Sequence, residues 1–478
     1  MAAVISMVRE SADQAAARSA TQNSEIDLAL AFAGERQGQW ILDHSRRQWH
    51  GYDPATGIFH PDRKEALLLD VQQFIHARAG GEPRLLKASV VSAVERLLRM
   101  QEVFAVTADE MDADPFVLGT PGGPYDLTTG RRLDPDPSLL ITQSTSVAPE
   151  FDIPTLWLQF LGEATGHDLE LITYLQRLCG YCLTGSTREE QLSFFWGSGG
   201  NGKGVFLGTL KDIAGSYAET TSTDTFLETR GDRNENDLAM LAGKRVAIAQ
   251  ESNEGRKWDA QRIKTCTGRD TVRAKYLYKD LFTFVPQFTL LIASNHRPRI
   301  GTVDDAWRRR LQLIPFVLKP AQPDPLLKEK LVDEYPAILG WMIEGAMLWH
   351  KDGLMVPESV LAASAKYLAE EDTIGLWFDE CCKLDNGADT ARKELYGSYS
   401  GWCREMGHGA ATVYAITRWL KGNKGVEQNM KKGTRPYLGV RLKDPFAEDA
   451  DPPAKATASS RAGDWHPDSQ DDGDAIPF

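Results

Sequence analysis

The sequence is poor in cysteine, and its cysteines lack the spacing of a metal site. Only six occur in 478 residues. Cys179 and Cys182 are separated by two residues within a leucine-rich stretch, without the second pair that a zinc site needs. No ligand set adjoins the remaining four, which are Cys266, Cys381, Cys382 and Cys403. We therefore expect no zinc, and free core thiols in a reducing cytoplasm.

Long apolar runs are absent as well. No stretch approaches the roughly 20 apolar residues that a membrane-spanning helix needs. The short apolar run Leu28 to Ala33 follows acidic residues, whereas a secretory signal begins with basic ones. The sequence thus predicts neither a signal peptide nor a membrane partner.

Positive charge is scarce overall but concentrated locally. Lysine and arginine number 54 against 67 acids, a net charge of −13 that would ordinarily argue against nucleic acid. The last 32 residues, 447–478, contribute −6 of this total, with eight acids and two bases. Residues 392–443 instead hold eleven lysines and arginines against three glutamates, a net +8. Overall acidity therefore does not exclude a nucleic-acid partner.

A glycine-rich loop ending in Gly-Lys is the most informative motif. It reads Gly197-Ser198-Gly199-Gly200-Asn201-Gly202-Lys203-Gly204-Val205. The apolar run Leu192 to Trp196 precedes it as a buried strand would, and apolar residues at helical spacing follow. Glycines allow the positive φ angles that turn successive N–H groups inward, and Lys203 can reach the β- and γ-phosphates. The motif predicts a nucleoside-triphosphate site; a glycine-rich turn with a chance lysine is the alternative.

Gly204 departs from the usual form of this motif. That position normally holds a serine or threonine whose hydroxyl is a ligand of Mg²⁺. We expect a water molecule to take the place of this ligand.

Two more apolar strands follow, each ending in a polar residue. Lys244 to Glu251 ends in a carboxylate, which beside a γ-phosphate would hold Mg²⁺ or polarise water. Glu251 is therefore the candidate catalytic carboxylate and metal ligand, with Glu254 as the alternative. Phe288 to Ser294 is followed by Asn295, whose amide can bridge the attacking water and the γ-phosphate. The alternative for Asn295 is that it only opens a turn.

A dense arginine run comes next, at Trp307-Arg308-Arg309-Arg310. The planar donor fork of arginine suits a phosphate presented by a neighbouring subunit. Arg308 and Arg309 are therefore candidate catalytic residues. The alternative is that they are surface arginines paired with Asp304 and Asp305.

A hairpin is predicted between the second and third strands. Tyr278-Lys279-Asp280 lies between two β-prone runs, Arg273 to Leu277 and Leu281 to Val285, and so forms the expected tip. Contacts to DNA phosphates, sugars or bases are expected from Lys275, Tyr276, Tyr278 and Lys279. An exposed surface hairpin without DNA contact is the alternative.

In this order, the motifs resemble those of the superfamily 3 helicases of the phage and plasmid primase–helicase family, which is related to the poxvirus-type primase–helicases. The resemblance rests on the glycine-rich loop, the Gln250-Glu251 strand end, the stretch Lys264 to Phe288, Asn295-His296-Arg297-Pro298, and the Trp-Arg-Arg…Ile-Pro-Phe ending. It implies an AAA+-like ATPase that uses ATP and Mg²⁺, forms a homo-hexameric ring and pulls single-stranded DNA through its pore. Gly204 lies within the variation of this family.

The flanks of the motor, residues 151–355, also resemble parts of this family. Residues 25–150, with a small β-meander in Gln39 to His60, resemble its accessory or collar domain. Larger relatives carry a primase-polymerase module ahead of that domain. Residues 1–24 are rich in Ala, Ser and Gln, and we expect them to be disordered and too short for such a module. The expectation is a helicase without primer synthesis.

The pattern of residues 356–446 predicts a winged-helix DNA-binding domain. Two amphipathic helices precede a basic turn and the strand Tyr437 to Leu442. The turn supplies the candidate DNA-binding residues Lys431, Lys432 and Arg435. A role in protein contact is the alternative for such a domain.

Residues 447–478 have the composition of a disordered acidic tail. The tail ends in Asp471-Asp472-Gly473-Asp474-Ala475-Ile476-Pro477-Phe478, which resembles the tip of bacterial single-stranded-DNA-binding proteins. In that family the terminal Phe enters an apolar pocket and the acids meet basic residues of replication enzymes. The resemblance implies recruitment of host proteins, such as a primase, in the cytoplasm of a bacterial host. A tail that only solubilises the ring or competes with DNA is the alternative.

These features together predict an α/β fold: an AAA+-like P-loop ATPase core, an N-terminal α+β accessory domain and a C-terminal winged-helix domain. The expected function is an ATP-dependent replicative helicase of a phage, satellite or plasmid-type element, acting on single-stranded and forked DNA. The alternative is an ATP-binding replication initiator or scaffold that binds origin DNA without unwinding it.

Overall fold

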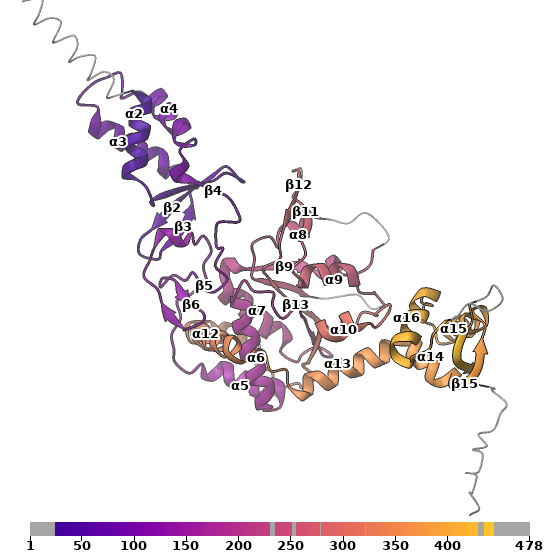
Figure 1. The fold of residues 1–478 in the computed structure, drawn as a ribbon. Coiled ribbons are helices and arrows are strands. Elements are labelled where there is room, and N and C mark those ends of the chain that lie inside the picture. Colours follow the sequence, from indigo (N-terminus) through magenta and orange to yellow (C-terminus); the bar gives the residue numbers. More distant parts are fainter. Residues whose placement is uncertain are drawn as a thin grey trace, which may run out of the picture.

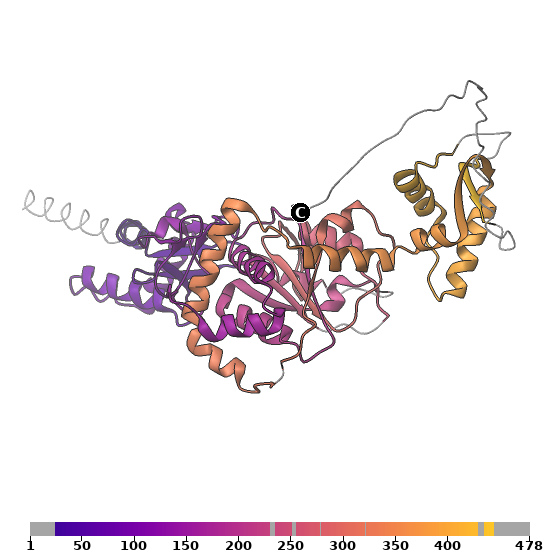
Figure 2. The same ribbon diagram turned by 90° about the horizontal axis from the view of Figure 1, so that it is seen from below.

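A parallel β-sheet covered by helices on both faces forms the centre of the protein (Figures 1 and 2). The computed structural model describes residues 24–229, 235–250, 255–277, 279–320, 322–428 and 435–443. Elements from the start and the end of the chain lie at opposite ends of the molecule (Figure 2). The predicted α/β class is confirmed.

The central sheet has five strands in the order β14-β8-β13-β10-β9, and all neighbours are parallel. The strands are β8 (Leu192–Trp196), β9 (Ala218–Ser222), β10 (Val246–Gln250), β13 (Thr289–Ser294) and β14 (Leu311–Pro315). Along β13, Leu290 and Ile292 belong to one hydrophobic core, whereas Leu291 and Ala293 belong to the other. Such strands are apolar on both faces because helices cover both sides.

Helices from distant parts of the chain form the two outer layers. One core includes residues of α5 (Thr155–Thr165), α6 (Leu169–Leu183), α7 (Lys203–Ala214) and α12 (Tyr335–Asp352). The other includes residues of α9 (Ala260–Thr267), α10 (Asp305–Arg310) and α13 (Glu358–Glu371). Helices α6 and α12 pack especially closely, since a Cβ at Gly180 would collide with the backbone of Ala346. Glycine is required at that crossing because any side chain would push the helices apart.

A small α+β unit precedes this core. Its sheet has the order β3-β2-β1-β4, from β1 (Trp40–Asp43), β2 (Gln48–Asp53), β3 (Ile58–Pro61) and β4 (Ala105–Val106). The strands β1, β2 and β3 are antiparallel, which confirms the predicted meander. The helices α2 (Glu25–Glu35), α3 (Ala66–Arg78) and α4 (Ala88–Leu98) bury apolar residues in one core with Trp40 and Trp49.

Short elements connect the two units. They are η1 (Glu102–Phe104), β5 (Val117–Leu118), β6 (Tyr125–Asp126), β7 (Arg131–Arg132) and η2 (Pro137–Leu139). The three strands form a small antiparallel sheet. Phe116 stacks on Trp349 of α12, so this sheet is attached to the helical layer of the core.

Within the core, further short segments surround the main strands. They are η3 (Gly215–Tyr217), η4 (Thr223–Phe226), α8 (Asn236–Ala239), α11 (Leu327–Leu331) and η5 (Val332–Glu334). The predicted hairpin is present as the antiparallel pair β11 (Val272–Lys275) and β12 (Leu281–Phe284), which stands away from the sheet (Figure 1). Tyr276 stacks on Phe282 of this hairpin at 5.1 Å between ring centroids, so its ring already has a partner.

A third unit follows α13, at the end of the described chain (Figure 1). It contains α14 (Thr373–Cys381), β15 (Cys382–Thr390), α15 (Arg392–Glu405), α16 (Val413–Lys424) and β16 (Tyr437–Leu442). The strands β15 and β16 are antiparallel, and Trp377, Tyr399 and Trp419 lie in the core that the helices share with them. The expected boundary at 356 precedes α13, but Tyr367 and Leu368 of α13 pack in the core beneath the central sheet.

All six cysteines are free thiols, as expected. Burial raises the pKa of Cys182 and of Cys266 to about 12, so these thiols are unreactive at neutral pH. Among the described residues there is no cluster of three His, Cys, Asp or Glu side chains that could hold a metal ion. The described helices also include none that is both long and apolar enough to cross a membrane.

Candidate nucleotide-binding site

Three strands of the central sheet end at the same level, and the glycine-rich loop begins there. Trp196 of β8 pairs with Ser294 of β13 and with Pro315 of β14. The residues that follow, Gly197, Asn295 and Phe316, therefore meet at the carboxyl edge of the sheet. Ligands of open parallel sheets bind at this edge.

The glycines of the loop adopt backbone angles that other residues disfavour. The φ angles of Gly199, Gly200 and Gly202 are +92°, +68° and +86°. Gly202 is the N-cap of α7, so the loop leads into the positive end of a helix. Gly197 has an ordinary φ but no room for a side chain, since a Cβ would collide with the carbonyl oxygen of Phe316. The loop has the local form of an anion-binding turn.

The Lys203 side chain folds back over this loop. Its Nζ donates hydrogen bonds to the carbonyl oxygen of Gly197 at 2.8 Å and to Oδ1 of Asn201 and of Asn295 at 3.0 Å each. An ammonium group has three donors, and here each finds one oxygen. Burial lowers the pKa of Lys203, and an anion beside it would favour the charged form again.

Asn201 holds the loop to the neighbouring strand end. Its Nδ2 donates to the carbonyl oxygen of Phe316, and the residue is only 2% exposed. Half-buried Val205 packs against the core beneath α7. The loop is thus anchored at both ends, and Lys203 lies between Asn201 and Asn295, two residues from separate loops at one sheet edge.

Gly204 is exposed, and a Cβ there would meet no atom of the described residues within 4 Å. We expect Gly204→Ser to fold and to stabilise α7 by about 0.5 kcal/mol, since serine has the better helix propensity. Its hydroxyl should also lower the Mg²⁺ concentration needed for half-maximal ATP turnover. A magnesium titration of turnover, together with thermal unfolding, measures both effects.

Gly208→Ser is the matched control for this prediction. Gly208 lies one turn further along α7, so its serine tests helix propensity without adding a hydroxyl at the loop. Equal magnesium requirements for the two variants would show that position 204 is not beside the metal.

The predicted carboxylate cannot be placed, because Glu251 and Glu254 both lie outside the described residues. Strand β10 ends at Gln250, which pairs with Ala293 of β13 and Ser222 of β9. The strand that should present the carboxylate therefore reaches the same edge of the sheet. The role of Glu251 as catalytic residue and metal ligand stays a prediction.

The arginine run separates into two classes. Arg310 is buried and forms an ion pair with Glu190 at 2.7 Å, whereas Arg308 and Arg309 are exposed. Within the described part of the chain, neither exposed arginine forms an ion pair, and Asp304 instead pairs with Arg418 at 3.7 Å. The alternative of surface pairing with Asp304 therefore gains no support.

The candidate DNA-binding residues are only partly described. Lys275 at the end of β11, Lys279 beyond it, and Arg435 before β16 are all exposed. Tyr278, Lys431 and Lys432 lie outside the described residues. The same holds for the partner-binding candidates Asp471, Asp472, Asp474, Ile476, Pro477 and Phe478. Their assignments stay predictions.

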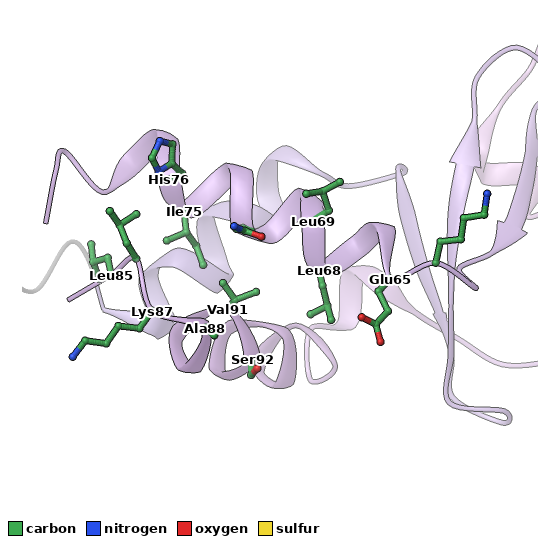
Figure 3. A pocket seen from close by; sticks show the side chains of 13 residues that line it. Glu65, Leu68, Leu69, Ile75, His76, Leu85, Lys87, Ala88, Val91 and Ser92 are labelled. Carbon is green, nitrogen blue, oxygen red and sulfur yellow. The ribbon is translucent and has the colours of Figure 1, made fainter. Parts of the chain in front are cut away.

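A groove of about 650 Å³ lies elsewhere, between α3 and α4 (Figure 3). Apolar side chains such as Leu68, Ile75 and Val91 line it together with Lys87 and Glu65. It includes no residue of the glycine-rich loop. A phosphate site is a shallow cradle of backbone donors, so a groove of this kind need not mark it.

Sequence reasoning overlooked three contributors to the site. The Phe316 carbonyl anchors Asn201, and the Phe160 ring closes on Gly202, where a Cβ would lie 2.7 Å from the ring. Arg297 lies over the ring of Trp196 at 4.9 Å, immediately before the loop. The position of Arg297, two residues after Asn295, could have indicated its role from the sequence. The contacts of Phe316 and Phe160 depend on tertiary packing.

Two family models match separate parts of the chain. Residues 31–166 match the family described as "D5 N terminal like". Residues 195–310 match a "Family of unknown function (DUF5906)", and this segment contains the glycine-rich loop and the arginine run. The two matches together span the N-terminal unit and most of the central sheet.

Two viral proteins are similar in sequence. "Putative helicase L207/L206" of Acanthamoeba polyphaga mimivirus is 26% identical over 305 residues, which cover 58% of this chain and 32% of that protein. "Putative helicase 022R" of Frog virus 3 (isolate Goorha) is 24% identical over 245 residues, covering 46% of this chain and 25% of that protein. The chain thus spans about a third or less of the length of these relatives.

Solved structures of the NrS-1 C terminal region are also similar to the chain. The apo structure of residues 305–718 covers 87% of this chain and 99% of that one, at 12% identity and a TM-score of 0.48. A second apo form covers 84% and 96%, at 11% identity and a TM-score of 0.45. The match to the D5 N terminal like model and the two helicase-named viral proteins support a relationship of this chain to D5-like helicases.

Proposed function

We propose that this protein is an ATP-dependent DNA helicase. The observation that carries the proposal is the Lys203 cradle, in which the ammonium contacts Asn201 and Asn295 at the carboxyl edge of a five-stranded parallel sheet. Counted along the chain, the sheet order is 5-1-4-3-2, with the loop strand β8 between the last strand and the fourth. This arrangement supports an AAA+-like P-loop ATPase core.

The residues present fit ATP as the ligand. Loop glycines, the N-terminus of α7 and Lys203 provide donors for the β- and γ-phosphates. When bound, Mg²⁺ would neutralise phosphate charge during γ-phosphoryl transfer to water. Lys203 would bind the phosphates, Asn295 would orient water beside them, and Glu251 would accept its proton and hold the metal. An open position at Gly204 leaves room for a water ligand.

A homo-hexameric ring would complete each site between subunits. Arg308 and Arg309 are exposed on the short helix α10 and form no ion pair with any described residue. They could therefore reach a neighbour's phosphate. A ring uses a heterologous contact, in which one surface of a subunit meets a different surface of the next. The β11–β12 hairpin, with exposed Lys275 and Lys279, would face the strand held in the pore.

The last described unit would bind duplex or forked DNA as a winged helix. Its element order is helix, strand, helix, helix, strand, and an isolated bridge pairs Gln428 with Tyr437, the first residue of the final strand. Helix α16 carries Arg418, Lys421 and Lys424, which places positive charge on the helix that would meet the groove. These features support DNA contact over protein contact alone.

An ATP-binding replication initiator or scaffold that does not unwind DNA is the second candidate, because the same basic unit could bind an origin. Strand displacement on a forked DNA with a 3′ tail, in ATP and Mg²⁺, separates the two. Displacement by the wild type that disappears in Lys203→Ala would support the helicase. DNA binding without displacement by either protein would favour the initiator.

We also propose that the chain's acidic C-terminal end recruits host replication proteins, such as a primase, in a bacterial cytoplasm. The support is the sequence Asp471 to Phe478, whose acids precede an apolar Ile-Pro-Phe end. Deleting residues 476–478 should abolish binding to a primase that recognises single-stranded-DNA-binding-protein tips. Unchanged binding in a titration would disprove this role, and Pro452→Ala is a control that leaves the end intact.

A further inference from the structure

One loop links the candidate nucleotide site to the C-terminal unit. Residues 297–304, which we call the relay segment, begin two positions after Asn295 and end at Asp304, the N-cap of α10. Asn295 accepts a hydrogen bond from Lys203, and α10 carries Arg308 and Arg309. The relay segment therefore lies between two groups assigned to ATP turnover.

The start of the relay segment is held against both the loop strand and α13. The Arg297 guanidinium lies over Trp196, at 4.9 Å from the ring centroid, and over Tyr367, at 5.3 Å. It also forms an ion pair with Glu370 at 2.8 Å. Trp196 directly precedes Gly197, and Tyr367 and Glu370 belong to α13. One side chain thus connects the base of the glycine-rich loop to α13. Helix α13 leads to the C-terminal unit (Figure 1).

The middle of the segment is held by α13 through buried polar contacts. The Tyr367 hydroxyl donates to the carbonyl oxygen of Pro298 and accepts from Nε1 of Trp258 at 3.1 Å. The carboxylate of Glu371 accepts from the backbone N–H of Ile300 at 2.7 Å. Breaking buried hydrogen bonds leaves unsatisfied polar groups, so the segment and α13 are expected to move together.

The C-terminal unit itself contacts the segment at two further points. Arg299 donates from Nη1 to the carbonyl oxygen of Gly407 at 3.2 Å, between α15 and α16. Arg418 of α16 pairs with Asp304 at 3.7 Å, and both side chains are partly exposed. Exposed ion pairs contribute little, so a DNA phosphate that binds Arg418 can replace Asp304.

We propose that the relay segment couples DNA binding by the C-terminal unit to nucleotide binding at Lys203, with Arg297 as the positioning residue. This rests on the proposed function. Nucleotide phosphates that take the donors of Lys203 release Asn295, while DNA phosphates that take Arg418 release Asp304. Each ligand thus changes contacts at one end of the same anchored segment, which is the differential interaction that coupling requires.

Coupling is measured as a thermodynamic cycle with the full chain. Binding of fluorescein-labelled forked DNA is titrated with and without a non-hydrolysable ATP analogue, and binding of the analogue is titrated with and without DNA. We expect each ligand to change the affinity of the other by the same factor, on the order of 10-fold. The cycle measures the coupling free energy between the two sites directly.

The test variants avoid both ligand sites. Glu370→Gln removes the ion pair of Arg297, and Arg299→Ala removes the contact to Gly407. Their combination should lower the coupling factor by about 3-fold, since the contacts of Tyr367, Glu371 and Arg418 with the segment remain, while each separate affinity stays near that of the wild type. Arg299→Lys keeps a donor and should restore part of the coupling. Glu358→Gln is the control, since Glu358 is exposed on α13 and forms no ion pair with any described residue.

The outcomes distinguish this inference from the proposed function. The relay would be overturned if the wild type binds both ligands but neither ligand changes the affinity of the other. It would also be overturned if the double variant keeps the full coupling factor. Either result would leave the helicase proposal intact. A wild type that binds no nucleotide would overturn both. A lowered coupling factor in the double variant but not in Glu358→Gln supports the relay.

Discussion

Replacing Lys203 by alanine should reduce ATP turnover by on the order of 10²- to 10³-fold, the cost of removing one preorganised donor from developing charge. Lys203 is 7% exposed, and its ammonium contacts three oxygens at the edge of the sheet. The charged hydrogen bonds that it would give to phosphate are worth about 1.5–3 kcal/mol, so ATP affinity should also fall by roughly 10- to 150-fold. Steady-state phosphate release and a nucleotide titration measure the two effects.

Lys211→Ala is the matched control for this change. Lys211 is exposed in the last turn of the same helix, so its removal alters charge on α7 without reaching the loop. Thermal unfolding of Lys203→Ala should stay cooperative but at a lower midpoint, because the variant leaves the oxygens of buried Gly197 and Asn201 without this donor. Wild-type turnover in the Lys203→Ala variant would disprove the nucleotide site.

Replacing Arg308 or Arg309 by alanine should lower turnover by on the order of 10³-fold, if one of them stabilises charge on a neighbour's γ-phosphate. Nucleotide affinity should change little, because the arginine acts on the transition state. Each side chain is exposed on α10 and has no acidic partner among the described residues. Phosphate-release rates for the two single variants would show which arginine acts.

Mixing inactive subunits tests whether the arginine works across an interface. Lys203→Ala subunits keep the arginine, and Arg308→Ala subunits keep the lysine, so mixed rings contain some interfaces with both groups. Turnover should therefore recover on mixing when the arginine acts on the next subunit. Absence of recovery would place its action within one subunit. Lys319→Ala is the control, since Lys319 is exposed and forms no ion pair with described residues.

Much of the strand framework was predictable from local patterns. Continuous apolar runs marked β8, β10 and β13, since strands buried on both faces lose the alternation of polar residues. The hairpin β11–β12 and the helix after the glycine-rich loop were visible for similar local reasons. Periodicity says nothing of strand order, however, and the position of β8 between β13 and β14 required the structure.

The candidate site divides in the same way. Lys203 and the glycines share one loop, so the sequence displayed them together, and Asn295 followed from its position after an apolar strand. Residue identity did not reveal that Asn295 contacts Lys203, 92 positions earlier, or that Arg310 is buried against Glu190, unlike its two neighbours. Burial of one arginine in a run depends on the helix face that meets the sheet.

The sequence by itself determined the local chemistry of this protein: a phosphate-binding loop, strands with polar ends, and charge that changes sign along the C-terminal part. These features depend on neighbours in the chain, which the sequence places directly. Only the tertiary structure decided the parallel order of the strands, the partners of Lys203 and the contacts of Arg297 with α13. Those contacts join residues far apart in the chain, and packing of the two helical layers around one sheet brings them together.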